Sequence, residues 1–157
     1  MTHPSASSSI DAPLAVVWAV MLDTERYGEW NPFVERVECR TPPEAGDPIV
    51  LHVRWATGKT SRSPERISAI EPPVTHGAVT TARLSYVYEG LPAKLRLVRG
   101  TRHQRLRQEE GGPTTYDTVE EFSGPLVRFA GPGRVAEGFR RHAAALKQRA
   151  EALAHQP

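Results

Sequence analysis

The feature that most constrains the fold is a double change in the spacing of apolar residues along the chain. Leu14, Val17, Trp18, Met21 and Leu22 are spaced as on one face of an α-helix. Between Phe33 and Phe122 apolar and polar residues alternate, as in half-buried β-strands. Helical spacing returns after Gly133. A helix, a long run of strands and a terminal helix can bury their apolar faces only if the sheet packs against a helix.

Turn-forming residues divide these patterns into elements. Residues 5–10 are β-compatible, and Asp11-Ala12-Pro13 supplies a polar cap and a proline for the first helical turn. A shorter helix is expected through Tyr27. The expected strands that follow are 33–39, 49–55, 64–70, 78–88, 95–109 and 114–122, with Pro72-Pro73 and Gly111-Gly112 among the separating turns. The final helix should be about 20 residues, or about 30 Å, long.

Composition limits the class of protein. A chain of 157 residues with 39% hydrophobic residues is expected to form one domain, 1–157. The single Cys39 excludes an internal disulfide framework, and the six histidines have no metal-ligand spacing, so we predict neither a metal nor a cofactor. A net charge of +2 gives no indication of nucleic-acid binding. Without a signal peptide or a membrane-spanning segment, we expect a soluble cytoplasmic monomer or homodimer with no stable membrane insertion.

Several short motifs have a family likeness. They are Ile10-Asp11-Ala12-Pro13 with Val17-Trp18, the run from Asp23 through Tyr27 to Trp30-Asn31-Pro32-Phe33, Glu120-Glu121-Phe122-Ser123-Gly124, and Ala145-Leu146-Lys147. With the order of elements, they resemble the START-like, or SRPBCC, superfamily and its polyketide cyclase/dehydrase-like branch. The resemblance implies an α+β helix-grip (Bet v 1/START-like) fold of order β-α-α-β(6)-α. In that fold a six- to seven-stranded curved antiparallel sheet surrounds a long C-terminal helix and leaves an apolar cavity.

The hairpin of strands 95–109 and 114–122 decides what lines that cavity. If it closes symmetrically about Gly111-Gly112, the opposed pairs are Arg107 with Tyr116, Arg105 with Thr118 and His103 with Glu120. The resemblance makes Phe122 an inward residue, and this register then places His103, Arg105, Tyr116 and Glu120 at the cavity wall. The opposite phase, with Arg102, Gln104 and Leu106 facing inward, remains open.

Candidate catalytic residues come from this wall and from the last helix. They are Glu120, His142, Arg105 and Tyr116. A buried glutamate beside an arginine or histidine could act as a general base or bind a ligand hydroxyl or carbonyl. It could equally be an ordinary cross-strand ion pair. His142 lies on the apolar stripe of the last helix and should point toward the sheet, either as a core histidine or as a proton-transfer group.

Aromatic side chains complete the expected ligand-binding set. To His103, Arg105, Tyr116, Glu120 and His142 we add Trp30, Phe33, Trp55, Tyr86, Tyr88 and Phe139. Large apolar faces with a polar tip are suited to gripping an aromatic or polycyclic ligand. The resemblance also places the Gly90-Leu91-Pro92 and Gly58-Lys59 regions at the cavity mouth.

These observations favour a carrier or binding protein for a small hydrophobic or amphipathic ligand, whose oxygen-bearing edge faces the polar wall. Two alternatives stay open. One is a polyketide aromatase/cyclase, in which cavity shape and a few polar groups direct cyclisation of an aromatic or polyketide-like ligand. The other is a co-chaperone-like interaction module, for which the outer surface would matter more than the cavity.

Overall fold

A computed structural model describes residues 3–156; residues 1–2 and 157, at the ends of the expected domain, lie outside the described residues. The elements are β1 (Ser5–Ile10), α1 (Leu14–Leu22), η1 (Thr24–Glu29), β2 (Val34–Cys39), β3 (Pro48–Arg54), β4 (Thr60–His76), β5 (Val79–Tyr88), α2 (Leu91–Lys94), β6 (Arg99–Glu109), β7 (Thr114–Ser123), η2 (Val127–Ala130) and α3 (Pro132–Ala154). Among residues 3–156, no helix combines the length and the hydropathy needed to cross a bilayer.

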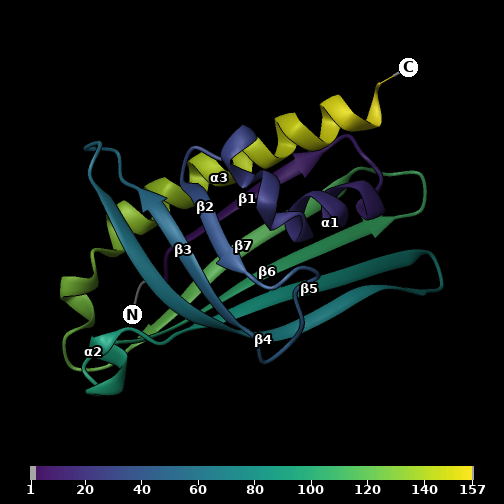
Figure 1. Cartoon of the computed structure of the whole chain (residues 1–157). Helices are drawn as coiled ribbons and strands as arrows, with labels where there is room; N and C mark the ends of the chain where they lie inside the picture. Colours follow the sequence, from purple (N-terminus) through teal and green to yellow (C-terminus); the bar gives the residue numbers. More distant parts are fainter. Residues whose placement is uncertain (1–2, 157) are drawn as a thin grey trace.

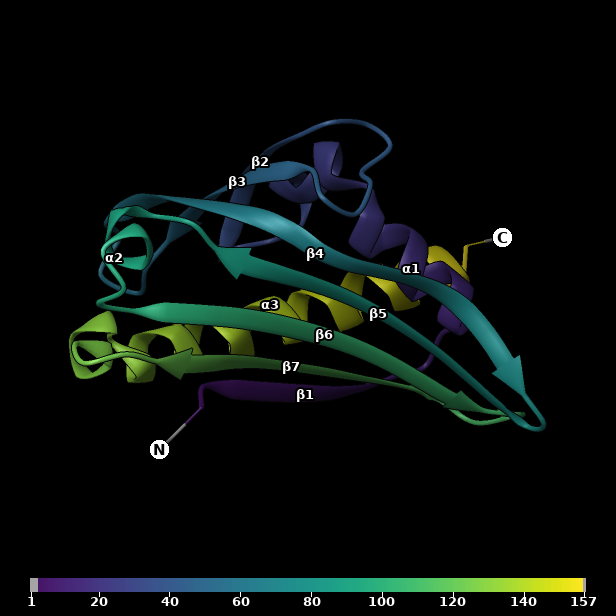
Figure 2. The ribbon, with the colours of Figure 1, turned by 90° about the horizontal axis from the view of Figure 1, so that it is seen from below.

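One antiparallel sheet of seven strands forms the body of the molecule, in the order β1-β7-β6-β5-β4-β3-β2. The sheet curves around α3, which runs along its concave side, while α1 lies at one end (Figures 1 and 2). The helix packs against β1, β7 and α1. The predicted helix-grip fold is therefore confirmed, with β1 as the seventh strand.

Two strands differ from their predicted bounds by more than one residue at an end. β4 extends well beyond the predicted 64–70. Its ends, 60–62 and 71–76, are exposed and show no apolar alternation, so no sequence pattern predicted them. Pro72-Pro73, predicted as a turn, lies inside β4 at an irregularity in its pairing with β5, where a missing N–H is tolerated. β6 begins at Arg99 rather than Leu95 because α2 and a left-handed residue, Arg96 (φ 58°), precede it.

The predicted register of the β6–β7 hairpin is wrong by one residue. The structure pairs Arg102 with Glu120 and Leu106 with Tyr116. The last pair is Gln108 with Thr114, and the five-residue connection 109–113 includes Pro113, which has no N–H with which to extend the ladder. Since a shift of one residue turns every side chain to the other face, the alternative phase of β6 is the observed one.

The close approach of α3 to the sheet depends on a glycine. A Cβ atom at Gly138 would lie 2.2 Å from Cε1 of Phe33, so a larger residue there would collide with the ring. Phe33 is 3% exposed and packs edge-on against both Trp55 and Phe139. Gly138 therefore lets the helix rest directly on an aromatic cluster.

Replacing Gly138 by alanine should destabilise the fold. Displacing the Phe33 ring should cost about 1–3 kcal/mol, which exceeds the helix-propensity gain of about 0.5–1 kcal/mol. The free energy of unfolding, measured by urea denaturation, should fall. Gly133→Ala is the matched control, because Gly133 also lies in α3 but has nothing within 4 Å of its Cβ position. Equal stability of the two variants would contradict this account of the Gly138 contact.

Candidate functional site

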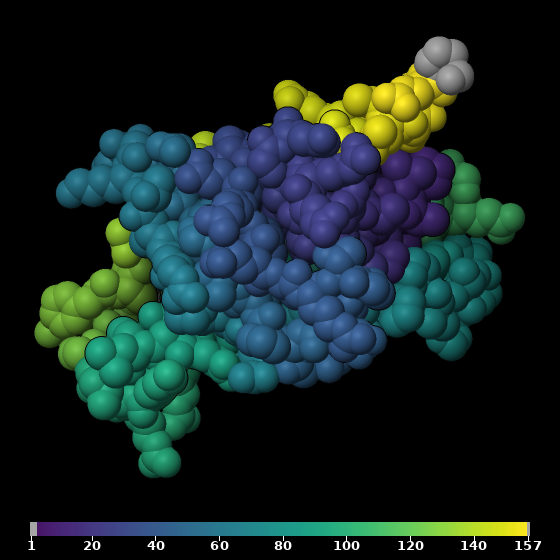
Figure 3. Space-filling model, in the orientation of Figure 1, coloured from purple at the N-terminus to yellow at the C-terminus, as the bar shows by residue number. Residues whose placement is uncertain are grey.

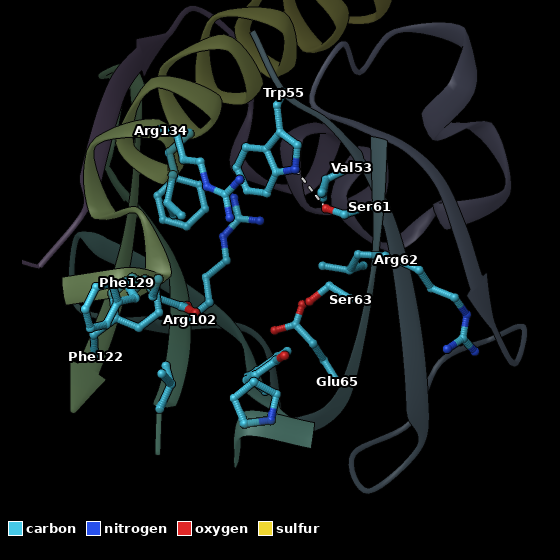
Figure 4. Close-up of a pocket in the computed structure, with 18 of the residues that line it drawn as sticks. Val53, Trp55, Ser61, Arg62, Ser63, Glu65, Arg102, Phe122, Phe129 and Arg134 are labelled. Carbon is cyan, nitrogen blue, oxygen red and sulfur yellow. Dashed lines mark hydrogen bonds between the residues drawn. The ribbon is translucent and has the colours of Figure 1, made fainter. Parts of the chain in front are cut away.

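A cavity of about 450 Å³ lies between the concave face of the sheet and the N-terminal part of α3 (Figure 4). Residues of β3, β4, β5, α2, β6, β7, η2 and α3 line it, together with Phe33, Trp55 and the chain that follows α2. The lining residues are Phe33, Leu51, Val53, Trp55, Ser61, Arg62, Ser63, Glu65, Tyr88, Pro92, Leu97, Val98, Arg102, Glu120, Phe122, Leu126, Phe129, Ala130, Arg134, Val135 and Phe139. A cavity of this size can hold a small organic ligand.

Most of the cavity wall is apolar. Phe33 joins two other lining rings, with its centroid 5.5 Å from that of Trp55 and 6.0 Å from that of Phe139. Leu51 and Val53 on β3 continue the surface. The wall therefore offers rigid aromatic and branched faces to a hydrophobic molecule.

A buried arginine interrupts this apolar wall. Arg102 is 3% exposed, and its Nε donates to Thr118 Oγ1 at 2.8 Å and its Nη2 to Tyr116 Oη at 3.4 Å. The guanidinium carbon lies 4.2 Å from the centroid of the Phe139 ring, in a cation–π contact. Among the described residues, no carboxylate oxygen comes within 4.0 Å of this guanidinium. The charge is thus held in place by neutral groups.

Two buried carboxyl groups share the cavity with Arg102. Burial, with a further contribution from Glu120, raises the pKa of Glu65 to about 8, although Arg102 opposes the shift. Burial likewise raises the pKa of Glu120 to about 7, again against the effect of Arg102. Oε2 of Glu120 is buried and has no hydrogen-bond partner among residues 3–156. Gly100 makes room for this carboxyl, since a Cβ there would lie 2.7 Å from Glu120 Oε1.

The two pKa values determine the charge of the cluster formed by Arg102, Glu65 and Glu120. With one carboxyl protonated and the other ionised, the cluster is neutral. Losing the second proton would leave a net negative charge in a largely apolar cavity, which burial disfavours. Near neutral pH the cluster therefore contains a cationic donor, a carboxylate acceptor and a carboxylic acid, a set that can bind hydroxyl and carbonyl oxygens.

A second lining arginine, Arg134, is exposed and so marks where the cavity opens to solvent. The Arg134 guanidinium stacks 4.3 Å from the Trp55 ring, and the Trp55 indole Nε1 donates to Ser61 Oγ at 2.8 Å. Figure 4 shows the Arg102 and Arg134 side chains converging on the same side of the cavity, with Glu65 across from them. The cavity therefore has cationic groups on one wall and a carboxyl on another.

Five of the residues expected to bind a ligand do line the cavity. They are Phe33, Trp55, Tyr88, Glu120 and Phe139. The expected pairing of Glu120 with His103 is wrong, because Glu120 lies opposite Arg102.

His103 and Arg105 do not reach the cavity. The one-residue register shift turns both onto the outer face of the sheet. There the Nδ1 atom of His103 is hydrogen-bonded to Ser85 Oγ at 2.8 Å, and its Nε2 atom lies 3.5 Å from Glu121 Oε2. Arg105 is exposed. The prediction that these two side chains form the cavity wall is therefore wrong.

Four other predicted residues lie outside the lining of the cavity: Trp30, Tyr86, Tyr116 and His142. Tyr116 has a supporting position, since its hydroxyl donates to Gln104 Oε1 at 2.8 Å and accepts from Arg102. The His142 ring is stacked on Tyr116, and its Nδ1 lies 3.1 Å from Asn31 Nδ2. Burial, and then Arg102, hold the pKa of His142 well below its usual value, so the ring is neutral.

Sequence reasoning missed Glu65 and Arg134 and gave Arg102 only as the alternative. Glu65 had a usable signal: it lies two residues before Ile67, an apolar residue of the same strand, and therefore on the same face. For Arg102 the signal was ambiguous, because arginines stand at odd and even positions of β6. Arg134 had no signal, since cationic residues at a helix start usually face solvent.

Both the sequence and the fold of this chain are similar to those of known proteins. Residues 1–151 match the sequence profile of the family described as polyketide cyclase/dehydrase and lipid transport. No curated protein matches the sequence.

Solved structures of several proteins share the fold. The ZhuI aromatase/cyclase from Streptomyces sp. R1128 has a TM-score of 0.65 and 18% identity, over 96% of this chain and 93% of that one. A START superfamily protein from Mycobacterium smegmatis has a TM-score of 0.61 and 16% identity, over 97% of this chain and 99% of that one. The di-domain ARO/CYC BexL of the BE-7585A biosynthetic pathway has a TM-score of 0.66 and 16% identity, and this chain, 99% covered, spans 50% of it. At these identities the likeness concerns the fold alone.

The buried carboxyls predict how stability depends on pH. The folded chain retains the Glu65 proton up to about pH 8, whereas the ordinary value is 4.5. Because the folded state then binds more protons than the unfolded state, the free energy of unfolding should fall as pH rises between these values, by at most about 1.4 kcal/mol per pH unit for each such group.

Denaturation at a series of pH values checks this with two variants. Glu65→Gln resembles the protonated carboxyl, so it should match wild type near pH 5 and be more stable than wild type above pH 8. Glu110→Gln, at an exposed position between β6 and β7, is the control and should follow the wild-type curve. If Glu65→Gln and wild type run parallel at all pH values, the raised pKa of Glu65 is wrong.

Proposed function

The chain belongs to the polyketide cyclase/dehydrase and lipid transport family of the START-like superfamily, and on that premise we propose that it binds one small amphipathic ligand in the cavity beneath α3. The observation that carries the proposal is the combination of a mainly apolar lining with one buried arginine that has no carboxylate within ion-pair distance among the described residues. An entirely hydrophobic ligand would leave that charge without a partner.

The apolar part of the lining supplies affinity. Burying apolar surface contributes about 25 cal/mol per Å², before the costs of association are subtracted. Phe33, Trp55 and Phe139 are held by mutual edge-on contacts, so little side-chain freedom remains to be lost on binding. This supports a ligand with a flat, ring-containing or otherwise rigid body.

The polar cluster supplies orientation. A ligand carbonyl or anionic oxygen can accept from the Arg102 guanidinium, and a ligand hydroxyl can donate to Oε2 of Glu120, which lacks a partner among residues 3–156. The ligand would therefore direct its oxygen-bearing edge toward β6 and β7 and its apolar body toward β3 and α3.

Two fluorescent probes that differ in one group test this arrangement. Anilinonaphthalene sulfonate and phenylnaphthylamine share their rings, but only the first has an anionic sulfonate. Arg102→Met should lower affinity for the sulfonate by about tenfold or more, through loss of a charged hydrogen bond, and leave affinity for phenylnaphthylamine nearly unchanged. Equal losses for both probes would contradict a selective role for Arg102.

A variant at the cavity mouth tests the location of binding. Ala130→Trp places a large ring at a lining position, and should weaken binding of both probes. Ala144→Trp, at an exposed position of α3, is the matched control and should bind as wild type does. Probe binding that survives Ala130→Trp, with unchanged near-ultraviolet circular dichroism, would place the probe elsewhere.

A second candidate function is a polyketide cyclase, favoured by the pKa of Glu120 at about 7 beside Arg102. An ionised carboxylate could take a proton from the carbon between two substrate carbonyls. The resulting enolate carbon would form a carbon–carbon bond to another carbonyl, whose oxygen, hydrogen-bonded to Arg102, would receive the proton back. No oxidant or cofactor is needed for this step.

The cyclase candidate is tested with a linear poly-β-carbonyl thioester and mass spectrometry of the products. Glu120→Gln should lower the rate of cyclisation by at least about a hundredfold, the usual contribution of a positioned general base. His142→Ala tests the earlier expectation for the helix histidine, which does not line the cavity. An unchanged product pattern with Glu120→Gln would remove this carboxyl from the mechanism.

A further inference from the structure

Large hydrophobic side chains are exposed around the mouth of the cavity. Leu91 is 67% exposed, Leu95 58%, Leu126 38% and Phe129 68%. The first two belong to the segment 90–100, which contains α2, and the other two to the segment 122–136, which contains η2. Phe129 and Leu126 also line the cavity. We call these two segments together the mouth surface.

The mouth surface is strongly and uniformly cationic. Its charged residues are Lys94, Arg96, Arg99, Arg128 and Arg134, and it contains no aspartate or glutamate. Within residues 3–156, none of these five cations forms an ion pair. Most other exposed cations do, so an unneutralised group of five is unusual for this chain.

The acidic residues that flank the mouth surface do not neutralise it. Glu89 pairs with Arg66 at 2.7 Å, and Glu137 with Arg141 at 2.7 Å. Glu121, directly before the second segment, lies 3.5 Å from His103. Each of these carboxylates thus faces a basic side chain outside the mouth surface. The positive charge of the mouth surface is left for an external partner.

The two segments form one continuous, projecting surface. The Leu126 N–H donates to the Leu97 carbonyl at 3.0 Å and joins them directly. Figure 1 shows α2 and the chain before α3 at the same end of the molecule, and in Figure 3 both project from its body. Their hydrophobic side chains therefore sit on projections of the surface.

We propose that the mouth surface docks on an anionic lipid bilayer. Leu91, Leu95 and Phe129 would enter the interfacial region, and the surrounding cations would bind headgroup phosphates. A projecting, uniformly charged surface suits a fluid bilayer, which needs no complementary shape, whereas a protein partner would need a groove and matched acidic positions. Docking of this kind is peripheral and requires no spanning segment.

Docking would also place the cavity entrance against the membrane. Pro92, Leu126 and Phe129 belong to the mouth surface and line the cavity, so a ligand could pass between bilayer and cavity without crossing water. This consequence rests on the proposed ligand-binding function. The docking itself does not.

Co-flotation of the whole chain with vesicles tests the proposal. Vesicles of equal parts phosphatidylcholine and phosphatidylserine should bind it, vesicles of phosphatidylcholine alone should bind it weakly, and added salt should weaken binding. Lys94→Gln with Arg99→Gln and Arg128→Gln should reduce the binding constant on the order of a hundredfold, since each cation near an anionic surface contributes roughly fivefold. Leu91→Ser with Leu95→Ser should reduce it on the order of tenfold.

Matched controls separate docking from general charge and from ligand binding. Arg26→Gln with Arg36→Gln and Arg107→Gln removes the same charge from exposed positions outside the mouth surface and should change vesicle binding little. Leu91 and Leu95 do not line the cavity, so their double variant should still bind phenylnaphthylamine. If the wild-type chain binds vesicles but does not bind phenylnaphthylamine, the ligand proposal is refuted and the docking proposal still stands.

Three outcomes would overturn the docking proposal. One is no preference of the wild-type chain for anionic vesicles. Another is an equal loss of vesicle binding in the mouth-surface charge variant and in the control charge variant, which would indicate unspecific electrostatic attraction. The third is failure to bind vesicles together with binding to immobilised polyglutamate that the mouth-surface charge variant loses, which would assign the surface to an acidic protein.

Discussion

The packing of one long helix against one curved sheet is the constraint on which the rest of this structure depends. The sheet buries its concave face against α3, with α1 covering one end, and the packing differs along α3. Toward the C-terminus Ala143, Leu146 and Ala150 are fully buried and fill the interface. Toward the N-terminus, Gly138 brings the helix onto Phe33, and the cavity lies between this part of the helix and the strands that line it.

The polar cluster is a consequence of the same packing. Once β6 and β7 face α3, Arg102 and Glu120 must point into a region with little water, and Glu65 meets them from β4. Neutral groups hold the guanidinium, and burial keeps a proton on one carboxyl, so the cluster avoids a net charge. Groups arranged in this way are available to a ligand because they are not saturated by one another.

The inside and the outside of the cavity mouth have related chemistry. Inside, a mainly apolar lining contains a few polar groups, and outside, exposed hydrophobic side chains stand among cations that form no ion pair within residues 3–156. Arg134 belongs to both, because it stacks on Trp55 at the opening. An amphipathic molecule would meet compatible surroundings at each stage of entry. The proposed ligand binding and the proposed docking therefore involve adjoining parts of the molecule.

The sequence by itself determined the order of the main helices and strands, because hydrophobic periodicity and turn residues are local signals. Its resemblance to the START-like superfamily implied the helix-grip fold. Of the aromatic lining, the sequence predicted Phe33, Trp55, Tyr88 and Phe139. It did not determine the polar wall. Arginines occupy both faces of β6, so neither phase was favoured by burial, and a symmetric turn about Gly111-Gly112 gave the wrong register. Only the tertiary structure fixed Arg102 rather than Arg105 as the buried cation, because Thr118, Tyr116 and Phe139, from two other elements, stabilise it. Contacts between residues far apart in sequence decide which charge is buried, and no local pattern encodes them.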